Sequence, residues 1–443
     1  MRLTSSSRPS TSSSVFTRFP GFIVLSLGIT LIGVGLSITR PYLSLFYTNV
    51  IHMSPLRLGV FTFVNGVGGV IASTWLGKLS DSRTPKKDIM LVSTVAAGLG
   101  YVSFLFLHAY WPLLIVSTVL LGLGSAAYPQ LFAYARESAR SAVQGDATIA
   151  ISTLRSFFSL AWVIGPLVGT WVLSSFHYQG LFVSTGIVFV VVFLLVLLRL
   201  ERRSLSTSTR ATRGRAAGKP KATGSAKDAN DISSRSDTTL WATLKATDVW
   251  MSCISFIAIS TAMTSNMLYM PLLVTRTLHG SERVVGWVFS LSAGLEIPIM
   301  IGLGVVAVRL GKRILLLGGA IFGTVYYLGM AFTHAPWEVL ALQILCAVYV
   351  SIAVSIGMSY FQDFMPDAPG AATTLYSNTS NVGSMTGSLL GGVIAQAFGF
   401  RAVFWLCVGL GVISYVFLLR RRSRSTQDTL SSTLPANLRT SSE

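Results

Sequence analysis

The sequence is poor in charged residues and in cysteine. Only 11% of its 443 residues are charged, whereas an average soluble domain has about 25%. With 51% hydrophobic residues, a soluble protein of this composition would lack the polar surface that water requires. The three cysteines, Cys253, Cys346 and Cys407, lie in separate apolar runs without disulfide or metal-site spacing. These shortages exclude a soluble domain or a disulfide scaffold and indicate an integral membrane protein.

The sequence also lacks the common motifs of catalysis and nucleotide binding. It has no phosphate-binding Gly-Lys-Ser/Thr loop, no HExxH and no GxSxG, and its five histidines show no metal-ligand spacing. Two glycine patterns, at 122–126 and 302–307, resemble dinucleotide fingerprints but lie inside apolar runs with no preceding strand. We therefore expect no enzymatic activity, no cofactor, no metal and no use of ATP.

What the sequence has is long apolar runs, which predict an all-α membrane protein of twelve transmembrane helices. We place these helices at 20–46, 56–77, 88–107, 111–135, 146–175, 180–200, 246–273, 284–307, 313–333, 336–362, 370–397 and 400–419. A polar stretch at 201–244, rich in Ser, Thr and basic residues, separates the first six helices from the last six. The predicted domains are thus two six-helix bundles, 20–200 and 245–420, joined by this linker and flanked by a disordered N-tail, 1–19, and a C-tail, 421–443.

The net charge of +18 comes from basic residues that cluster in the tails, the linker and alternate loops. This pattern follows the positive-inside rule, so both termini and the linker are predicted to be cytoplasmic, and the partner of the basic residues is the lipid bilayer rather than nucleic acid. One loop, 363–369, breaks the pattern because it carries Asp363 and Asp367 and no basic residue.

The two halves are related by an internal repeat. Gly165 and Gly169 match Gly387 and Gly391 at a separation of 222 residues, and three aromatic positions that follow share this separation. A repeat of six helices predicts a transporter architecture with its site between the halves near the membrane midplane.

Several motifs carry a resemblance to a known family. The loop 77–87, GKLSDSRTPKK, resembles the helix 2–3 signature of the major facilitator superfamily, in which Gly77, Asp81, Arg83, Lys86 and Lys87 would form a cytoplasmic gate motif. The Gly-Pro-x-x-Gly of 165–169 resembles the superfamily's antiporter motif, although glycine packing between helices explains it equally well. The blocks PQLFAYARE, RSFFSLAWVIGP, AGLEIPIMI and YFQDFMPDAPGAATTLYSN resemble the sugar efflux transporters, a bacterial branch of this superfamily.

This resemblance implies proton-coupled export of sugars or glycosides by alternating access between two bundles, by a monomer in a bacterial plasma membrane. Sugar recognition requires planar hydrogen-bonding groups and aromatic surfaces, and the predicted cavity-lining helices offer both. The candidate substrate-binding residues are Arg40, Asn65, Gln130, Trp162, Asn266, Tyr269, Gln343, Asn378 and Asn381. Each of these side chains can instead serve as an interhelical hydrogen bond, so the hypothesis rests on the set rather than on any member.

Two charges inside apolar runs are the remaining candidates. Arg155 in the fifth helix and Glu296 in the eighth each cost a few kcal/mol in a membrane unless they face a partner or water. In the superfamily arrangement these helices meet across the halves, so we predict that Arg155 and Glu296 pair there and couple protons to transport. The alternative is a static buried pair that fixes helix register.

Two other functions remain open on the sequence alone. A multidrug/proton antiporter of the same superfamily would have a cavity dominated by aromatic and aliphatic side chains. A non-transporting membrane receptor or sensor would use the linker for signalling, for which 201–244 is short and without recognisable motifs.

Overall fold

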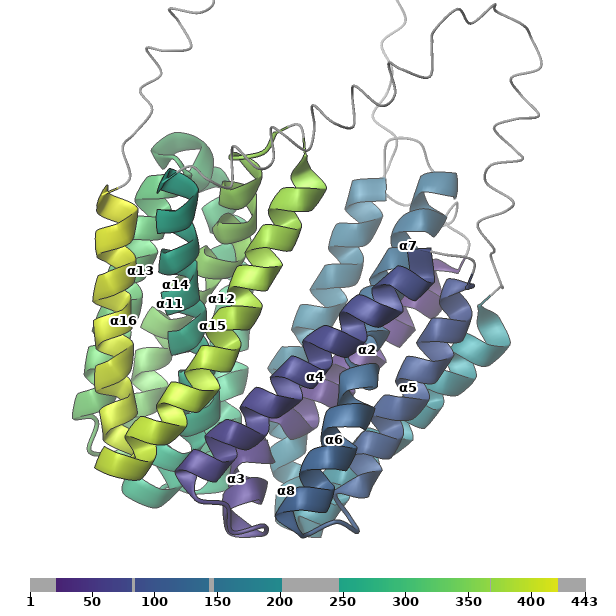
Figure 1. Cartoon of the computed structure of the whole chain (residues 1–443), viewed down its shortest axis with the longest axis horizontal. Coiled ribbons are helices and arrows are strands. Elements are labelled where there is room, and N and C mark those ends of the chain that lie inside the picture. Colours follow the sequence, from purple (N-terminus) through teal and green to yellow (C-terminus); the bar gives the residue numbers. More distant parts are fainter. Residues whose placement is uncertain (1–20, 82–83, 143–146, 201–246, 367, 421–443) are drawn as a thin grey trace, which may run out of the picture.

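The computed structural model of the chain describes residues 21–81, 84–142, 147–200, 247–366 and 368–420. The predicted tails 1–19 and 421–443 and the linker 201–244 lie outside these residues. The described chain forms helices in two groups that stand side by side, one from each half of the sequence (Figure 1). The predicted all-α class is confirmed.

The first group contains the helices up to Arg199. They are α2 (Phe22–Thr39), the 3-10 turn η1 (Arg40–Tyr42), α3 (Leu43–Asn49), α4 (Pro55–Asp81), α5 (Lys86–Ser103), α6 (Tyr110–Gly124), α7 (Ala127–Ala142) and α8 (Ala147–Arg199). Helix α8 is broken at His177, where φ is 56° and ψ is −166°. Its two arms correspond to the helices predicted at 146–175 and 180–200, which continue through a kink instead of a loop.

The second group repeats this arrangement. It contains α11 (Thr247–Leu272), the π-helical turn η2 (Leu273–Thr277), α12 (Glu282–Leu310), α13 (Lys312–Phe332), α14 (Pro336–Gln362), α15 (Pro369–Phe398) and α16 (Phe400–Arg420). Helix α14 has the predicted bounds, because Pro336 occupies a first-turn position where its missing N–H costs nothing.

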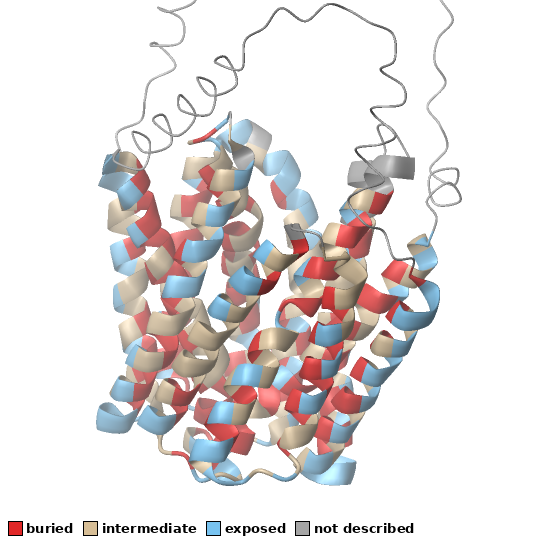
Figure 2. Cartoon of the chain, turned by 45° about the vertical axis from the view of Figure 1, so that its right-hand side comes forward, coloured by how far each residue is buried: buried red, intermediate tan, exposed pale blue. Residues whose placement is uncertain are grey.

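Membrane character is visible on the surface as well as in helix length. Within the described residues, nine helical segments are long and apolar enough to cross a membrane, and one of them, Thr153–Arg199, contains the His177 break. Exposed residues occur along the full length of the helices (Figure 2), and they include large apolar side chains such as Trp75 and Ile301, as a lipid-facing surface requires. Helices α5 and α15 are not among the nine, so twelve crossings stay a prediction.

The helix ends define two ends of the molecule. We call the end at which α8 finishes and α11 begins the linker end, and the opposite end, with the turns at 50–54 and 278–281, the far end. His52 and His279 occupy these two far-end turns and both have a left-handed backbone, with φ of 57° and 52°. Because non-glycine residues rarely adopt this conformation, its recurrence at equivalent turns supports the internal repeat.

Candidate functional site

The two groups meet along a seam in which α4 packs on α15 and α8 packs on α12. Near the far end the backbones are in direct contact. A Cβ atom added to Gly59 would lie 2.5 Å from the carbonyl oxygen of Ser388, and one added to Gly392 would lie 2.8 Å from the carbonyl oxygen of Pro55. Glycine is required on both sides of this contact because any side chain would push the groups apart.

A second close approach joins α12 to the first group. A Cβ atom on Gly286 would overlap the Thr170 hydroxyl and would lie 2.6 Å from the Tyr42 hydroxyl and 2.9 Å from the Pro166 carbonyl oxygen. The Tyr42 hydroxyl already donates to that carbonyl oxygen at 2.6 Å, so the ring cannot move aside without losing a buried hydrogen bond. Gly286 therefore allows the far end of the seam to close.

Hydrogen bonds across the seam lie at the same end. The Tyr178 hydroxyl donates to Glu282 Oε1 at 2.7 Å, and the Arg276 guanidinium donates to the Thr48 carbonyl oxygen at 3.1 Å and to Asn49 Oδ1 at 2.7 Å. Asn49 Nδ2 also donates to the Tyr178 hydroxyl at 3.3 Å, which joins the two contacts into one network. We call Asn49, Tyr178, Arg276 and Glu282 the far-end latch.

Removing the latch arginine should loosen the far end. The measurement is the rate at which a membrane-impermeant maleimide labels a cysteine placed at the buried Ser388. We expect Arg276→Ala to raise this rate about three- to tenfold. Two hydrogen bonds of roughly 0.5 to 1.5 kcal/mol each are lost, and their energy is reduced because the arginine is exposed to solvent. Arg283→Ala, at an exposed position in the first turn of α12, is the control. Equal labelling rates in wild type and Arg276→Ala would show that Arg276 does not hold the far end closed.

The two groups diverge toward the linker end of the seam. Helices α4 and α15 stand farther apart here than at the far end, where their backbones touch (Figure 1). Arg155 on α8 and Asn378 and Asn381 on α15 are exposed. Because a polar side chain in a membrane-spanning helix avoids lipid, this exposure indicates contact with water from the linker end.

The clearest polar cluster lies inside the second group and contains two of the predicted sugar contacts. The Tyr326 hydroxyl, on α13, donates to Asn266 Oδ1 on α11 at 3.0 Å and lies beside the Gln343 side chain on α14. Gln343 is buried and its Nε2 donates to the Val339 carbonyl oxygen of its own helix at 2.9 Å. The sequence suggested Asn266 and Gln343 but gave no signal for Tyr326.

Glu296 extends this cluster on α12. Its carboxylate accepts a hydrogen bond from Ser292 at 3.1 Å, and the same hydroxyl lies 3.9 Å from the Cys346 sulfur, which is next to Tyr326. A chain of polar side chains thus runs from Glu296 to the amide cluster. Ser292 and Cys346 were missed by sequence reasoning because serine and cysteine are common in apolar helices.

Arg155 and Glu296 do not meet in this conformation. Val163 of α8 lies opposite Gly294 of α12, with a Cβ on the glycine 3.8 Å from the valine side chain. Counting from this contact toward the linker end, Arg155 is eight residues away and Glu296 only two, so the two differ by about 9 Å along the helices at 1.5 Å per residue. Arg155 instead lies within electrostatic range of Tyr128 and of Tyr376 on α15. Their pairing stays a prediction for another conformation.

The other predicted contacts fall into two kinds. Gln130 and Tyr269 are buried and tie helices together: Gln130 Oε1 accepts from Ser80 at 3.0 Å, and the Tyr269 hydroxyl donates to the Ser388 carbonyl oxygen at 2.9 Å. The others are more accessible, as a ligand contact requires. Trp162 and Asn65 are half-buried and Arg40 is exposed beside Tyr101. The Asn65 amide oxygen is itself buried and has no partner among the described residues, while Nδ2 donates to the Phe61 carbonyl oxygen at 2.9 Å.

Two lysines of the predicted gate motif contact residues of their own group, and the gating role stays a prediction. Lys86 pairs with Glu137 at 2.8 Å, and Lys87 donates to the Leu197 and Leu200 carbonyl oxygens at the end of α8, so both are held by their own group. A Cβ on Gly77 would meet nothing within 4 Å. Arg83 and the Asp81 side chain lie outside the described residues.

The second half repeats these contacts. Lys312 pairs with Asp363 at 2.6 Å, and Arg313 donates to the Leu418 and Leu419 carbonyl oxygens at the end of α16. This pairing explains why the loop at 363–369 carries an acid where the positive-inside rule expects a base. The acid neutralises a lysine on the neighbouring helix and adds little net charge to the linker end.

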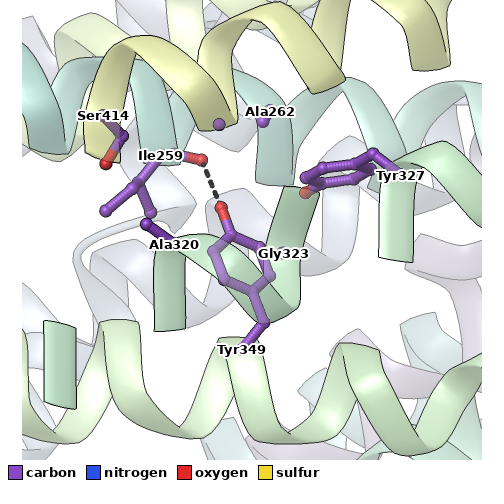
Figure 3. Close-up of a pocket in the computed structure, with 8 residues that line it drawn as sticks. Ile259, Ala262, Ala320, Gly323, Tyr327, Tyr349 and Ser414 are labelled. Atoms are coloured by element: carbon purple, nitrogen blue, oxygen red, sulfur yellow. Dashed lines mark hydrogen bonds between the residues drawn. The ribbon is translucent and has the colours of Figure 1, made fainter. Parts of the chain in front are cut away.

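One small pocket lies inside the second group, between α11, α13, α14 and α16 (Figure 3). It is lined by apolar and small residues, and the Tyr349 hydroxyl closes one side by donating to the Ile259 carbonyl oxygen at 3.2 Å. The space does not admit a water molecule, so it is a packing defect at a helix crossing and no ligand site.

The comparisons with known proteins agree with this architecture. The sequence model of the Major Facilitator Superfamily matches residues 25–265 and 251–440. The chain is 34% identical to sugar efflux transporter B of Salmonella typhimurium over 394 residues, which cover 88% of this chain and 93% of that one. It is 32% identical to sugar efflux transporter C of Escherichia coli over 395 residues, covering 88% and 93%. This chain belongs to the sugar efflux transporter family of the major facilitator superfamily.

A solved structure shows the same fold at greater sequence distance. The nucleoside transporter NupG superimposes with a TM-score of 0.72 at 12% identity, covering 90% of this chain and 99% of that one. The predicted major facilitator fold is therefore confirmed, and the chain is a multi-pass membrane protein. In a sugar efflux transporter, the seam between the two groups is the natural place for the substrate path.

Proposed function

We propose that this protein is a secondary transporter that exports sugars or glycosides across a bacterial plasma membrane, coupled to protons, as a monomer and without enzymatic activity. The observation that carries the proposal is the asymmetry of the seam. Its far end is closed by glycine contacts and the latch, and its linker end exposes Arg155, Asn378 and Asn381. With the linker end in the cytoplasm, this is the conformation that loads substrate from inside the cell.

The side chains along the seam favour sugars over apolar drugs. Asn378 and Asn381 offer both donors and acceptors, which match the alternating hydroxyls of a sugar. A multidrug transporter would instead need an aromatic and aliphatic surface, because its ligands present few hydroxyls. Protons supply the energy in this account, with Glu296 as the carrier and Arg155 as its partner in the opposite conformation.

The test is a flux assay in inside-out vesicles with radiolabelled glucose, galactose and lactose, with and without a proton gradient. The proposal predicts gradient-dependent accumulation of at least one of these sugars. Vesicles that accumulate none of them but accumulate a cationic dye would favour the multidrug alternative.

Asn378 provides a residue-level prediction. We expect Asn378→Ala to raise the KM for the transported sugar about three- to tenfold with unchanged membrane expression, because one exposed amide is lost at roughly 0.5 to 1.5 kcal/mol. Thr374→Ala, exposed one turn away and bonded to its own helix at Gly370, is the control. Wild-type KM in Asn378→Ala would remove this residue from the sugar site.

A further inference from the structure

Tyr326 occupies an unusual place for a polar group. It lies on α13, which packs mainly on α14 and α16 and forms none of the seam, and its side chain is fully buried. A phenolic hydroxyl in an apolar bundle is costly unless it is hydrogen-bonded. The neighbouring Tyr327 is equally buried and packs on it at a ring distance of 5.0 Å.

The Tyr326 hydroxyl contacts two of the predicted sugar-binding residues. It donates to Asn266 Oδ1 at 3.0 Å and lies beside Gln343 and Cys346 of α14. One hydroxyl therefore joins two of the four amides that the sequence marks as sugar contacts in this group, Asn266 on α11 and Gln343 on α14.

This bond decides which end of the Asn266 amide is free. An asparagine side chain has an acceptor oxygen and a donor nitrogen that occupy similar space, and it can turn over unless one end is held. With Oδ1 held by Tyr326, the Nδ2 group is the free end, and Asn266 is half-buried whereas Tyr326 is not exposed at all. Asn266 thus presents two N–H donors rather than a lone-pair acceptor.

We propose that Tyr326 is a positioning residue of the sugar site, which holds Asn266 so that its amide donates to a hydroxyl oxygen of the sugar. The inference rests on the proposed sugar transport and assigns a role to a helix that does not line the seam. Without the hydroxyl, Asn266 loses its fixed orientation and must be ordered again each time sugar binds.

The experiment measures equilibrium binding of the radiolabelled sugar found in the flux assay to purified protein, for four variants. Tyr326→Phe should weaken binding about three- to tenfold, the range of one hydrogen bond. Tyr327→Phe, which removes a hydroxyl from an equally buried neighbour that interacts with Tyr349 instead, should bind as wild type. Asn266→Ala should weaken binding at least as much, and Tyr326→Phe combined with Asn266→Ala should be no weaker than Asn266→Ala alone.

The double variant separates positioning from general structural support. If Tyr326 only stabilised the bundle, its loss would add to the loss of Asn266, and additive effects would overturn the proposal. Wild-type binding in Tyr326→Phe would overturn it too, while leaving the sugar function intact because wild type still binds and transports. A wild-type protein that binds none of the three sugars would overturn the proposed function itself.

Discussion

Replacing Gly286 by valine is expected to reduce sugar transport by ten- to a hundredfold. Even a single Cβ at this position meets the Tyr42 hydroxyl at 2.6 Å and the Pro166 carbonyl oxygen at 2.9 Å, and two further methyl groups make the overlap worse. Overpacking of this kind costs about 1 to 3 kcal/mol, and every 1.4 kcal/mol is a factor of ten in the population of the closed far end. The measurement is the initial rate of gradient-driven sugar flux in vesicles.

The control for this prediction lies on the same helix. Gly302 of α12 is exposed and a Cβ there would meet nothing within 4 Å, so Gly302→Val should keep near-normal flux. If Gly286→Val transports as fast as wild type, the close contact at the far end is not part of the transport cycle. If both variants fail equally, valine damages α12 as a helix and the seam contact is not the cause.

Replacing Glu296 by glutamine is expected to abolish accumulation against a gradient while leaving sugar exchange across the membrane. Glu296 lies midway along α12, where a charged carboxylate costs about 2.5 to 3.5 kcal/mol, and Ser292 donates its hydrogen bond. Glutamine can keep that hydrogen bond but cannot carry a proton. Flux with the gradient should therefore fall to the level that wild type reaches without one.

Glu338→Gln provides the matched control. Glu338 stands at the far-end start of α14, where its carboxylate accepts the His334 backbone N–H at 2.8 Å, away from the seam. Its variant should retain gradient-driven flux. Proton-coupled transport in Glu296→Gln equal to wild type would remove Glu296 from the coupling role and leave it as a residue that fixes helix packing.

Helix positions could be predicted from the sequence because membrane helices need long apolar runs with clear start and stop signals. Helix α14 illustrates this, since Pro336 marks its start. The repeat was also visible, and the structure extends it to the pairs Lys86–Glu137 and Lys312–Asp363, which share a separation of 226 residues. The four residues occur at this separation in the sequence, but the sequence alone does not show that they pair, because pairing between loops depends on how the helices pack.

The site was less predictable for a physical reason. Sequence spacing places a residue on a helix, but it does not set the sliding of one helix past another, and this sliding decides whether Arg155 meets Glu296. Partners such as Tyr326 come from a helix without any polar pattern. The latch residues Arg276 and Glu282 lie between the helices predicted at 246–273 and 284–307, in a loop where charged residues are ordinary and give no signal.

The central claim is that the seam alternates between a closed far end and a closed linker end. It is tested most directly by distances between spin labels. One pair of labels is placed at the far end, on His177 and His279, and one pair at the linker end, on Lys78 and Thr374. All four positions are exposed in this conformation. The account predicts two populations whose proportions shift with sugar and pH, the far-end distance lengthening as the linker-end distance shortens. Distances that stay fixed, or that lengthen and shorten together, would contradict it.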